Sequence, residues 1–129
     1  MIFKIRNKYI PPELAANLSN PDVQNTLKVS GQYFITYEEI DGKVTPEEIY
    51  KGKVFTLEPL ADRRVQYVGI GSNGLMKFSV SKVSDVRYLL DGPYASAFIE
   101  FRKAEDGSIK KYIELVYKGG NIKNRAIGE

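Results

Sequence analysis

The chain has 129 residues with no cysteine and no histidine, and its 19 basic and 16 acidic residues give a net charge of +3. The missing side chains exclude disulfide scaffolds, thiolate or imidazole metal sites and the usual histidine-activated nucleophiles. We therefore expect one domain that is not an enzyme, needs no cofactor or metal, and carries too little positive charge for a dedicated duplex-DNA clamp.

The first ten residues, MIFKIRNKYI, alternate apolar and basic side chains and are followed by two prolines. This pattern predicts a short strand, and it contains no apolar run of the length found in a signal peptide. No stretch of the chain approaches the roughly 18 consecutive apolar residues of a membrane-spanning helix. We expect a cytoplasmic protein, or a virion protein if it is viral, with no membrane contact. Residues 1–10 are a candidate extension for contacting a partner.

Three short helical segments are expected in the first half of the chain. Pro12 sets the backbone for a first helical turn, and Asn20 is a typical cap for a second helix. Thr45 and Glu48 have the spacing of a capping box. The helix that they begin must end by Gly52.

The rest of the sequence consists of β-branched and aromatic runs separated by turn residues. Segment 84–90 fits either a helix or a strand. The expected strands cover residues 31–44, 53–60, 63–70, 75–81, 95–103 and 109–118. This pattern predicts a mainly β fold with a few short helices, arranged as a single small antiparallel barrel or sandwich that spans residues 1–129.

Gly69, Gly71 and Gly74 have the G-x-G-x-x-G spacing of phosphate-binding loops. In a dinucleotide-binding unit the third glycine begins a helix whose N-terminus holds the pyrophosphate. Here the following residues, 75–81, alternate with a period of two, which is typical of a strand, and the other protein-kinase motifs are absent. We therefore interpret the segment as a hairpin turned by Ser72-Asn73-Gly74, with the first two glycines at a bulge or a close backbone approach.

The last hairpin has two alternative registers around Gly107. A two-residue turn would place Ile99 opposite Glu114 and set like charges against each other. A three-residue loop over 105–107, with its glycine in the left-handed conformation, places Ile99 opposite Ile113 instead. Since a slip of one residue turns every side chain to the other face, the hydrophobic pattern favours the three-residue loop.

In this register the second face of the hairpin mixes aromatic, apolar and charged side chains. Its members are Phe98, Glu100, Arg102, Lys110, Tyr112, Glu114 and Val116. Three interpretations of this face are open. Another sheet or helix of the chain covers it, a protein partner contacts it, or its aromatic side chains stack on the bases of single-stranded nucleic acid. Arg63 and Arg64 are further candidates for gripping a phosphate or a partner carboxylate, although they also suit the beginning of a strand.

The C-terminal residues 118–129, KGGNIKNRAIGE, are mostly polar. A terminal segment with so few apolar residues can bury little against its own domain, so we expect a neighbouring subunit to restrain it. In this interpretation Lys123 and Arg125 make polar contacts around Ile122 and Ile127.

These observations predict a non-enzymatic structural or interaction subunit of a larger assembly, for example a virion head or tail component. Its partners would be other protein subunits in a homo- or hetero-oligomer. The alternative is a single-stranded DNA- or RNA-binding module that uses the aromatic and basic hairpin face, as the isoelectric point of about 9.0 also suggests.

Overall fold

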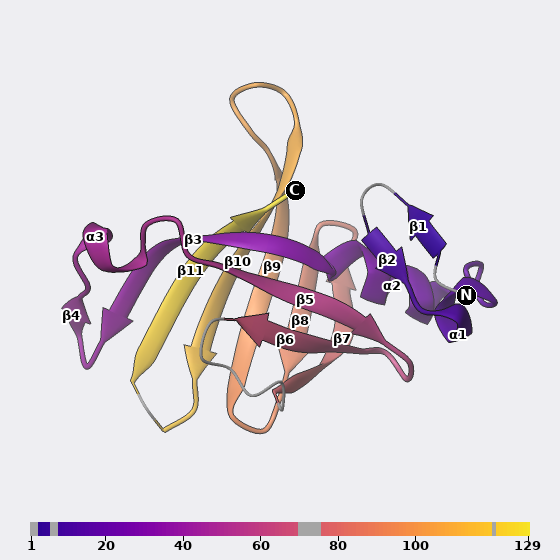
Figure 1. The fold of residues 1–129 in the computed structure, drawn as a ribbon, viewed down its shortest axis with the longest axis horizontal. Coiled ribbons are helices and arrows are strands. Elements are labelled where there is room, and N and C mark those ends of the chain that lie inside the picture. The colour runs from indigo at the N-terminus through magenta and orange to yellow at the C-terminus, as the bar shows by residue number, and fades with distance from the viewer. Residues whose placement is uncertain (1–2, 6–7, 70–75, 120) are drawn as a thin grey trace.

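The computed structural model describes residues 3–5, 8–69, 76–119 and 121–129, and its centre is a closed antiparallel β-barrel (Figure 1). The eight barrel strands are β3 (Gly31–Ile40), β5 (Val54–Leu60), β6 (Arg64–Gly69), β7 (Lys77–Ser84), β8 (Arg87–Asp91), β9 (Ala95–Lys103), β10 (Ile109–Tyr117) and β11 (Ile122–Gly128). Strand β11 pairs with β3 and closes the barrel, and the short β4 (Lys43–Val44) extends beside β3. The prediction of a mainly β fold is confirmed, and of the two predicted architectures, barrel and sandwich, the structure is a barrel.

The described residues form three short helices, α1 (Pro12–Ala15), α2 (Pro21–Val29) and α3 (Glu47–Tyr50). Asn20 caps α2 as predicted, because its side-chain oxygen accepts a hydrogen bond from the Asp22 N–H at 2.9 Å. The predicted capping box at Thr45 is wrong: Pro46 is the N-cap of α3 and makes no side-chain hydrogen bond. The Thr45 N–H instead donates to the Glu38 carbonyl at 2.8 Å, which ties this residue to the β3–β4 hairpin.

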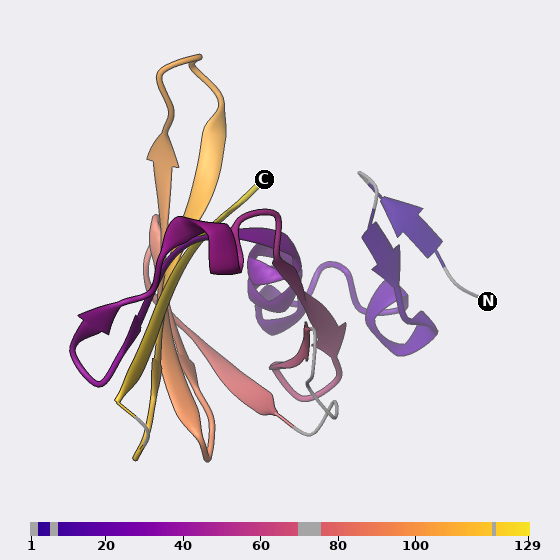
Figure 2. The same ribbon diagram turned by 60° about the vertical axis from the view of Figure 1, so that its left-hand side comes forward.

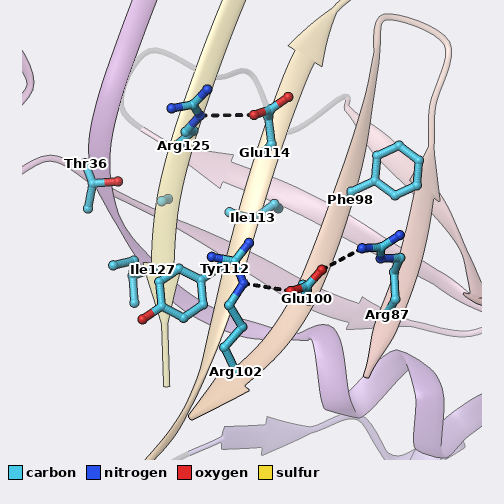
Figure 3. A pocket seen from close by; sticks show the side chains of 11 residues that line it. Thr36, Arg87, Phe98, Glu100, Arg102, Tyr112, Ile113, Glu114, Arg125 and Ile127 are labelled. Atoms are coloured by element: carbon cyan, nitrogen blue, oxygen red, sulfur yellow. Dashed lines mark hydrogen bonds and ion pairs between the residues drawn. The ribbon is translucent and has the colours of Figure 1, made fainter. Parts of the chain in front are cut away.

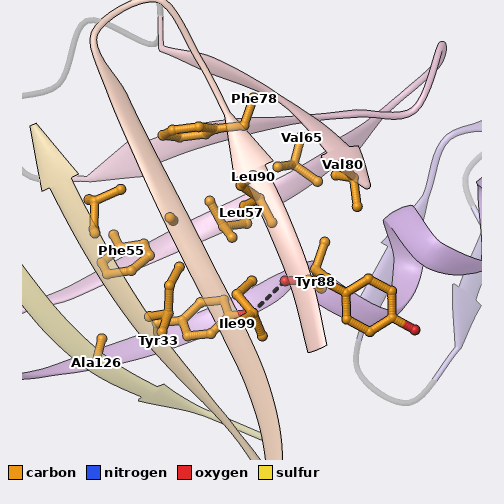
Figure 4. Packing of buried hydrophobic residues seen from close by; sticks show 14 of the residues in the cluster. Tyr33, Phe55, Leu57, Val65, Phe78, Val80, Tyr88, Leu90, Ile99 and Ala126 are labelled. Atoms are coloured by element: carbon orange, nitrogen blue, oxygen red, sulfur yellow. Dashed lines mark hydrogen bonds between the residues drawn. The ribbon is translucent and has the colours of Figure 1, made fainter. Parts of the chain in front are cut away.

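The interior is filled by alternate residues of the barrel strands (Figure 4). The Phe55 ring stacks between Tyr33 and Tyr67, with ring centroids 5.3 and 4.9 Å apart. Phe78 and Val80 of β7 are buried, so the predicted period of two after the glycine motif is confirmed. The ambiguous segment 84–90 provides β8, which begins at Arg87 and pairs with β7 and β9.

The β9–β10 hairpin has the predicted three-residue loop. Ile99 lies opposite Ile113, and Gly107 has a φ of +87°. Lys110 nevertheless lies opposite Arg102, so two like charges face each other in the observed register as well. Apolar pairing inside the barrel therefore decides this register, and exposed charge does not.

Residues 118–129 form an integral part of the barrel, which corrects the expectation that they cannot be held by their own domain. Strand β11 lies between β10 and β3, and its Asn124 and Ala126 are only 8% and 2% exposed. A strand with neighbours on both edges pairs its backbone groups whatever its side chains are, so the count of apolar residues underestimated how firmly this segment is held. Gly128 also packs tightly here, since a Cβ atom would lie 2.8 Å from Cδ2 of Tyr33.

Strands β1 (Phe3–Ile5) and β2 (Lys8–Ile10) form a separate two-stranded sheet beside the barrel (Figure 2). The single opening strand predicted for residues 1–10 is therefore a pair of strands. Its role as a partner-contacting extension stays a prediction. None of the helices in the described ranges is long and apolar enough to span a membrane.

Helix α2 packs against β5 and β7 at one end of the barrel. The Tyr33 hydroxyl donates to the Val29 carbonyl at 2.6 Å, which links this helix to the core. Lys111, only 3% exposed, donates from Nζ to the Ser30 carbonyl at 2.7 Å. These contacts fix the residues at the C-terminal end of α2 to the barrel.

Candidate functional site

A hollow on the described surface lies on the outside of the barrel wall, across the adjacent strands β3, β11, β10, β9 and β8 (Figure 3). Its volume is about 580 Å³. We call this surface the outer face. It is lined by Thr36, Arg87, Phe98, Glu100, Arg102, Tyr112, Glu114, Arg125 and Ile127, and its floor includes Ile113 and Ala126, which belong to the buried core.

The strand registers arrange the outer face in rows that run across the strands. One row consists of Arg87, Glu100, Tyr112, Ile127 and Phe34. The next row consists of Leu89, Phe98, Glu114, Arg125 and Tyr37. Each row therefore places charged side chains of both signs beside aromatic or aliphatic ones.

Glu100 is the centre of the ionic contacts in the first row. Its carboxylate accepts hydrogen bonds from Nη2 of Arg87 and from Nε of Arg102, each at 2.8 Å. These two hydrogen bonds lower the pKa of the Glu100 carboxyl. The Arg102 guanidinium also lies over the Tyr112 ring, 4.6 Å from its centroid, and covers that aromatic surface.

The second row has a matching arrangement around Arg125. Its Nε donates to the Glu114 carboxylate at 3.0 Å, and its guanidinium lies 4.7 Å from the centroid of the Tyr37 ring. The Tyr37 hydroxyl donates to Glu39 at 2.8 Å, and this hydrogen bond raises the pKa of the phenol. Each of these arginines is thus paired with a carboxylate of the same chain, and Arg87 and Arg102 share Glu100.

The structure brings together most of the residues that were predicted for the hairpin face. Phe98, Arg102 and Tyr112 line the hollow, and Lys110 lies beside them with its Nζ 3.8 Å from Oε1 of Glu129. Val116 is on the same side, one row beyond. Phe98 remains 55% exposed, so no described element covers this face, and the interpretation as a covered surface is wrong for the described residues.

All four residues that were predicted from the tail lie in β11, and two of them line the hollow. Arg125 and Ile127 belong to the outer face, and Lys123 lies opposite Val116 on the neighbouring strand. Ile122 instead lines a pocket at one end of the barrel. Their contact with a partner stays a prediction, but their position between β10 and β3 is now established.

Arg63 and Arg64 lie at the turn between β5 and β6, away from the outer face. Nη2 of Arg64 is 3.9 Å from Asp62, and Arg63 lines a separate hollow of about 520 Å³ beside α2. Arg63 also has a φ of +58°, which fits its place in a tight turn. The two arginines therefore cannot act together with the outer face.

Sequence reasoning missed Arg87 and Tyr37 as members of this surface. Segment 84–90 fitted either a helix or a strand, so the sequence did not determine that the Arg87 side chain lies on the outside of the barrel. Tyr37 belongs to the outer face only because β3 pairs with β11. A local sequence pattern does not predict a pairing between segments so far apart in the chain.

The glycine motif does not form a phosphate site in the part of it that the structure describes. Gly69 is the last residue of β6, and a Cβ atom there would lie 2.9 Å from the Tyr67 ring, so the group that approaches it closely is a side chain. The following element is strand β7 and not a helix. Gly71 and the predicted turn at Ser72-Asn73-Gly74 lie outside the described residues.

Within the described ranges, no three acidic side chains converge in a way that would hold a metal ion. Comparison of the chain with protein-family models, with curated proteins and with solved structures finds no match.

Proposed function

We propose that this protein is a non-enzymatic subunit of a larger assembly, such as a virion component, and that a second copy of the chain docks on its outer face. The observation that carries this proposal is the exposed array of alternating arginine–glutamate pairs and aromatic or aliphatic side chains. Aromatic residues and arginine are the types enriched in protein–protein interfaces.

The charge pattern favours a copy of the same chain as the occupant. In a two-fold interface the same patch meets itself, so the patch must be complementary to its own charges. Arg87 and Arg102 flank Glu100, and Arg125 flanks Glu114, so both signs occur side by side. A patch of a single sign would repel its copy.

The apolar part of the face provides the burial that a stable contact needs. Phe98 and Phe34 are exposed by more than half, and Val116 is also exposed. A stable interface buries about 800 Å² per partner, so the contact must extend over several strands of the face.

Sedimentation velocity over a range of concentrations tests this proposal. We expect the fraction of dimer to rise with protein concentration. We expect Phe98→Glu to remain monomeric, because the interface would bury a carboxylate without a partner. Val68→Glu is the matched control, because Val68 is exposed on β6, on the opposite side of the barrel. A monomeric wild-type chain at every concentration, or equal dimerisation of Phe98→Glu, would contradict the proposal.

Single-stranded nucleic acid is the alternative occupant. Base stacking needs free aromatic faces, and phosphate binding needs free cations. Phe98 is exposed, but the Tyr112 and Tyr37 rings each carry a guanidinium group on one face, and these guanidinium groups are paired with carboxylates. A fluorescence titration with a labelled oligonucleotide at two salt concentrations distinguishes nucleic-acid binding from docking of a second copy. Binding that weakens as salt rises would favour the nucleic-acid function and overturn the docking proposal.

A further inference from the structure

The barrel end opposite α2 contains a pocket of about 350 Å³. It is lined by Ile35, Glu38, Ile40, Lys53, Val54, Tyr67, Tyr117, Ile122 and Asn124. The mouth of a β-barrel is a preferred place for a small ligand. This pocket is separate from the outer face and does not depend on the function proposed for it.

A cluster of hydrogen-bonded polar side chains lies in this pocket. Apolar residues at these positions would fill the barrel without the free-energy cost of removing polar groups from water. The buried Asn124 donates from Nδ2 to Oε2 of Glu38 at 3.2 Å. The hydroxyls of Tyr67 and Tyr117 are hydrogen-bonded to each other. Burial raises the pKa of both phenols above the ordinary value, at which a tyrosine is already neutral near pH 7.

A β-bulge brings the Glu38 carboxylate into the pocket. The register between β11 and β3 shifts at Thr36, so that Glu38 lies opposite the inward-facing Asn124. Strict alternation from the buried Tyr33 would have turned Glu38 to the outside. Bulges commonly re-aim a side chain next to a functional site.

The Glu38 charge suits a cationic ligand. Among the described residues, no lysine or arginine lies within ion-pair distance of Glu38. Lys53 also lines the pocket, but it is exposed and its charge is screened by solvent. The two tyrosine rings can attract a cation through their π-faces, and a carboxylate forms its strongest hydrogen bonds with an ammonium group.

We propose that this pocket binds a small organic ammonium ion. The ammonium group contacts the Glu38 carboxylate and the tyrosine rings. The hydrocarbon part of the ligand packs against Ile35, Val54 and Ile122, which form the apolar part of the wall.

An NMR titration of the full chain with butylammonium and, separately, with butyrate tests this inference. We expect butylammonium to shift the side-chain amide signals of Asn124 in a saturable way, and butyrate to leave them unchanged. No saturable shift with butylammonium, or an equal response to butyrate, would overturn the proposal without the need for any variant.

A pair of neighbouring substitutions then locates the binding charge. Glu38→Gln keeps an oxygen that can accept the Asn124 hydrogen bond but removes the charge, and we expect it to weaken butylammonium binding by about tenfold or more. Glu39→Gln is the matched control, because Glu39 lies on the outside with Tyr37 and should leave the affinity unchanged. Equal affinities of Glu38→Gln and the wild type would contradict a role for the carboxylate.

Discussion

Two fully buried tyrosines near the helical end of the barrel differ in one hydrogen bond. The Tyr33 hydroxyl donates to the Val29 carbonyl at 2.6 Å. The Tyr88 ring packs against Phe101, with ring centroids 5.6 Å apart, and its buried hydroxyl has no hydrogen-bond partner among the described residues. A buried polar group without a partner costs free energy, so the same residue type is stabilising in one position and costly in the other.

This contrast predicts opposite effects of one substitution. Tyr88→Phe should raise the free energy of unfolding by about 1 kcal/mol, because it removes only the unpaired hydroxyl. Tyr33→Phe should lower it by about 1 kcal/mol, because the Val29 carbonyl loses its donor. Urea unfolding followed by circular dichroism measures both. A loss of stability in Tyr88→Phe would show that its hydroxyl is satisfied in solution.

At the scale of the element, the barrel strands separate neighbouring residues into two environments. Lys110 and Lys111 are adjacent on β10, yet Lys110 is outside beside Glu129 and Lys111 is buried beside Ser30. Strand β11 uses the same alternation, with Arg125 on the outer face and Ala126 in the core. One strand therefore supplies both residues of the outer face and part of the barrel interior.

The close packing of β11 on β3 leads to a prediction for Gly128. Gly128→Ala should destabilise the protein by about 1–3 kcal/mol, because the new methyl group would overlap the buried Tyr33 ring. Gly107→Ala is the comparison, since this site has open space and only the cost of its positive φ, about 1 kcal/mol. Thermal unfolding ranks the two variants. A milder effect at Gly128 than at Gly107 would contradict tight packing at the β11–β3 seam.

At the scale of the whole molecule, the pairing of β11 with β3 turns a sheet into a closed barrel. Closure removes the unpaired strand edges that an open sheet would present to other chains. We therefore expect the barrel wall to associate through its side chains on the outer face. Among the described strands, β4 and the β1–β2 sheet lie outside the closed wall and have strand edges of their own.

A terminal deletion tests the importance of this closure. Removal of residues 122–129 takes away β11 and should abolish the cooperative unfolding transition, because β10 and β3 each lose a hydrogen-bonded neighbour. Removal of residues 1–7 takes away β1, which pairs only with β2 among the described strands, and should leave the main transition intact. Calorimetry compares the two deletions. A cooperative unfolding transition in the variant that lacks residues 122–129 would contradict the essential role of β11.

The local predictions that succeeded depend on residues that lie close together in the chain. The period of two after Gly74 identified a strand, Asn20 identified the beginning of a helix, and the apolar match of Ile99 with Ile113 identified the hairpin register. The capping box at Thr45 failed because a backbone hydrogen bond to the neighbouring strand competes for the same residue.

The sequence by itself determined that this is a β-rich chain without thiol or imidazole chemistry and with a mixed aromatic and ionic face on its last hairpin. Only the tertiary structure decided that the polar tail closes the barrel, that Arg87 and Arg125 join this face, and that a bulge turns Glu38 inward. The physical reason is the same in each case. Alternation along one strand assigns side chains to two faces, whereas pairing between distant strands sets which faces meet and where the alternation is interrupted.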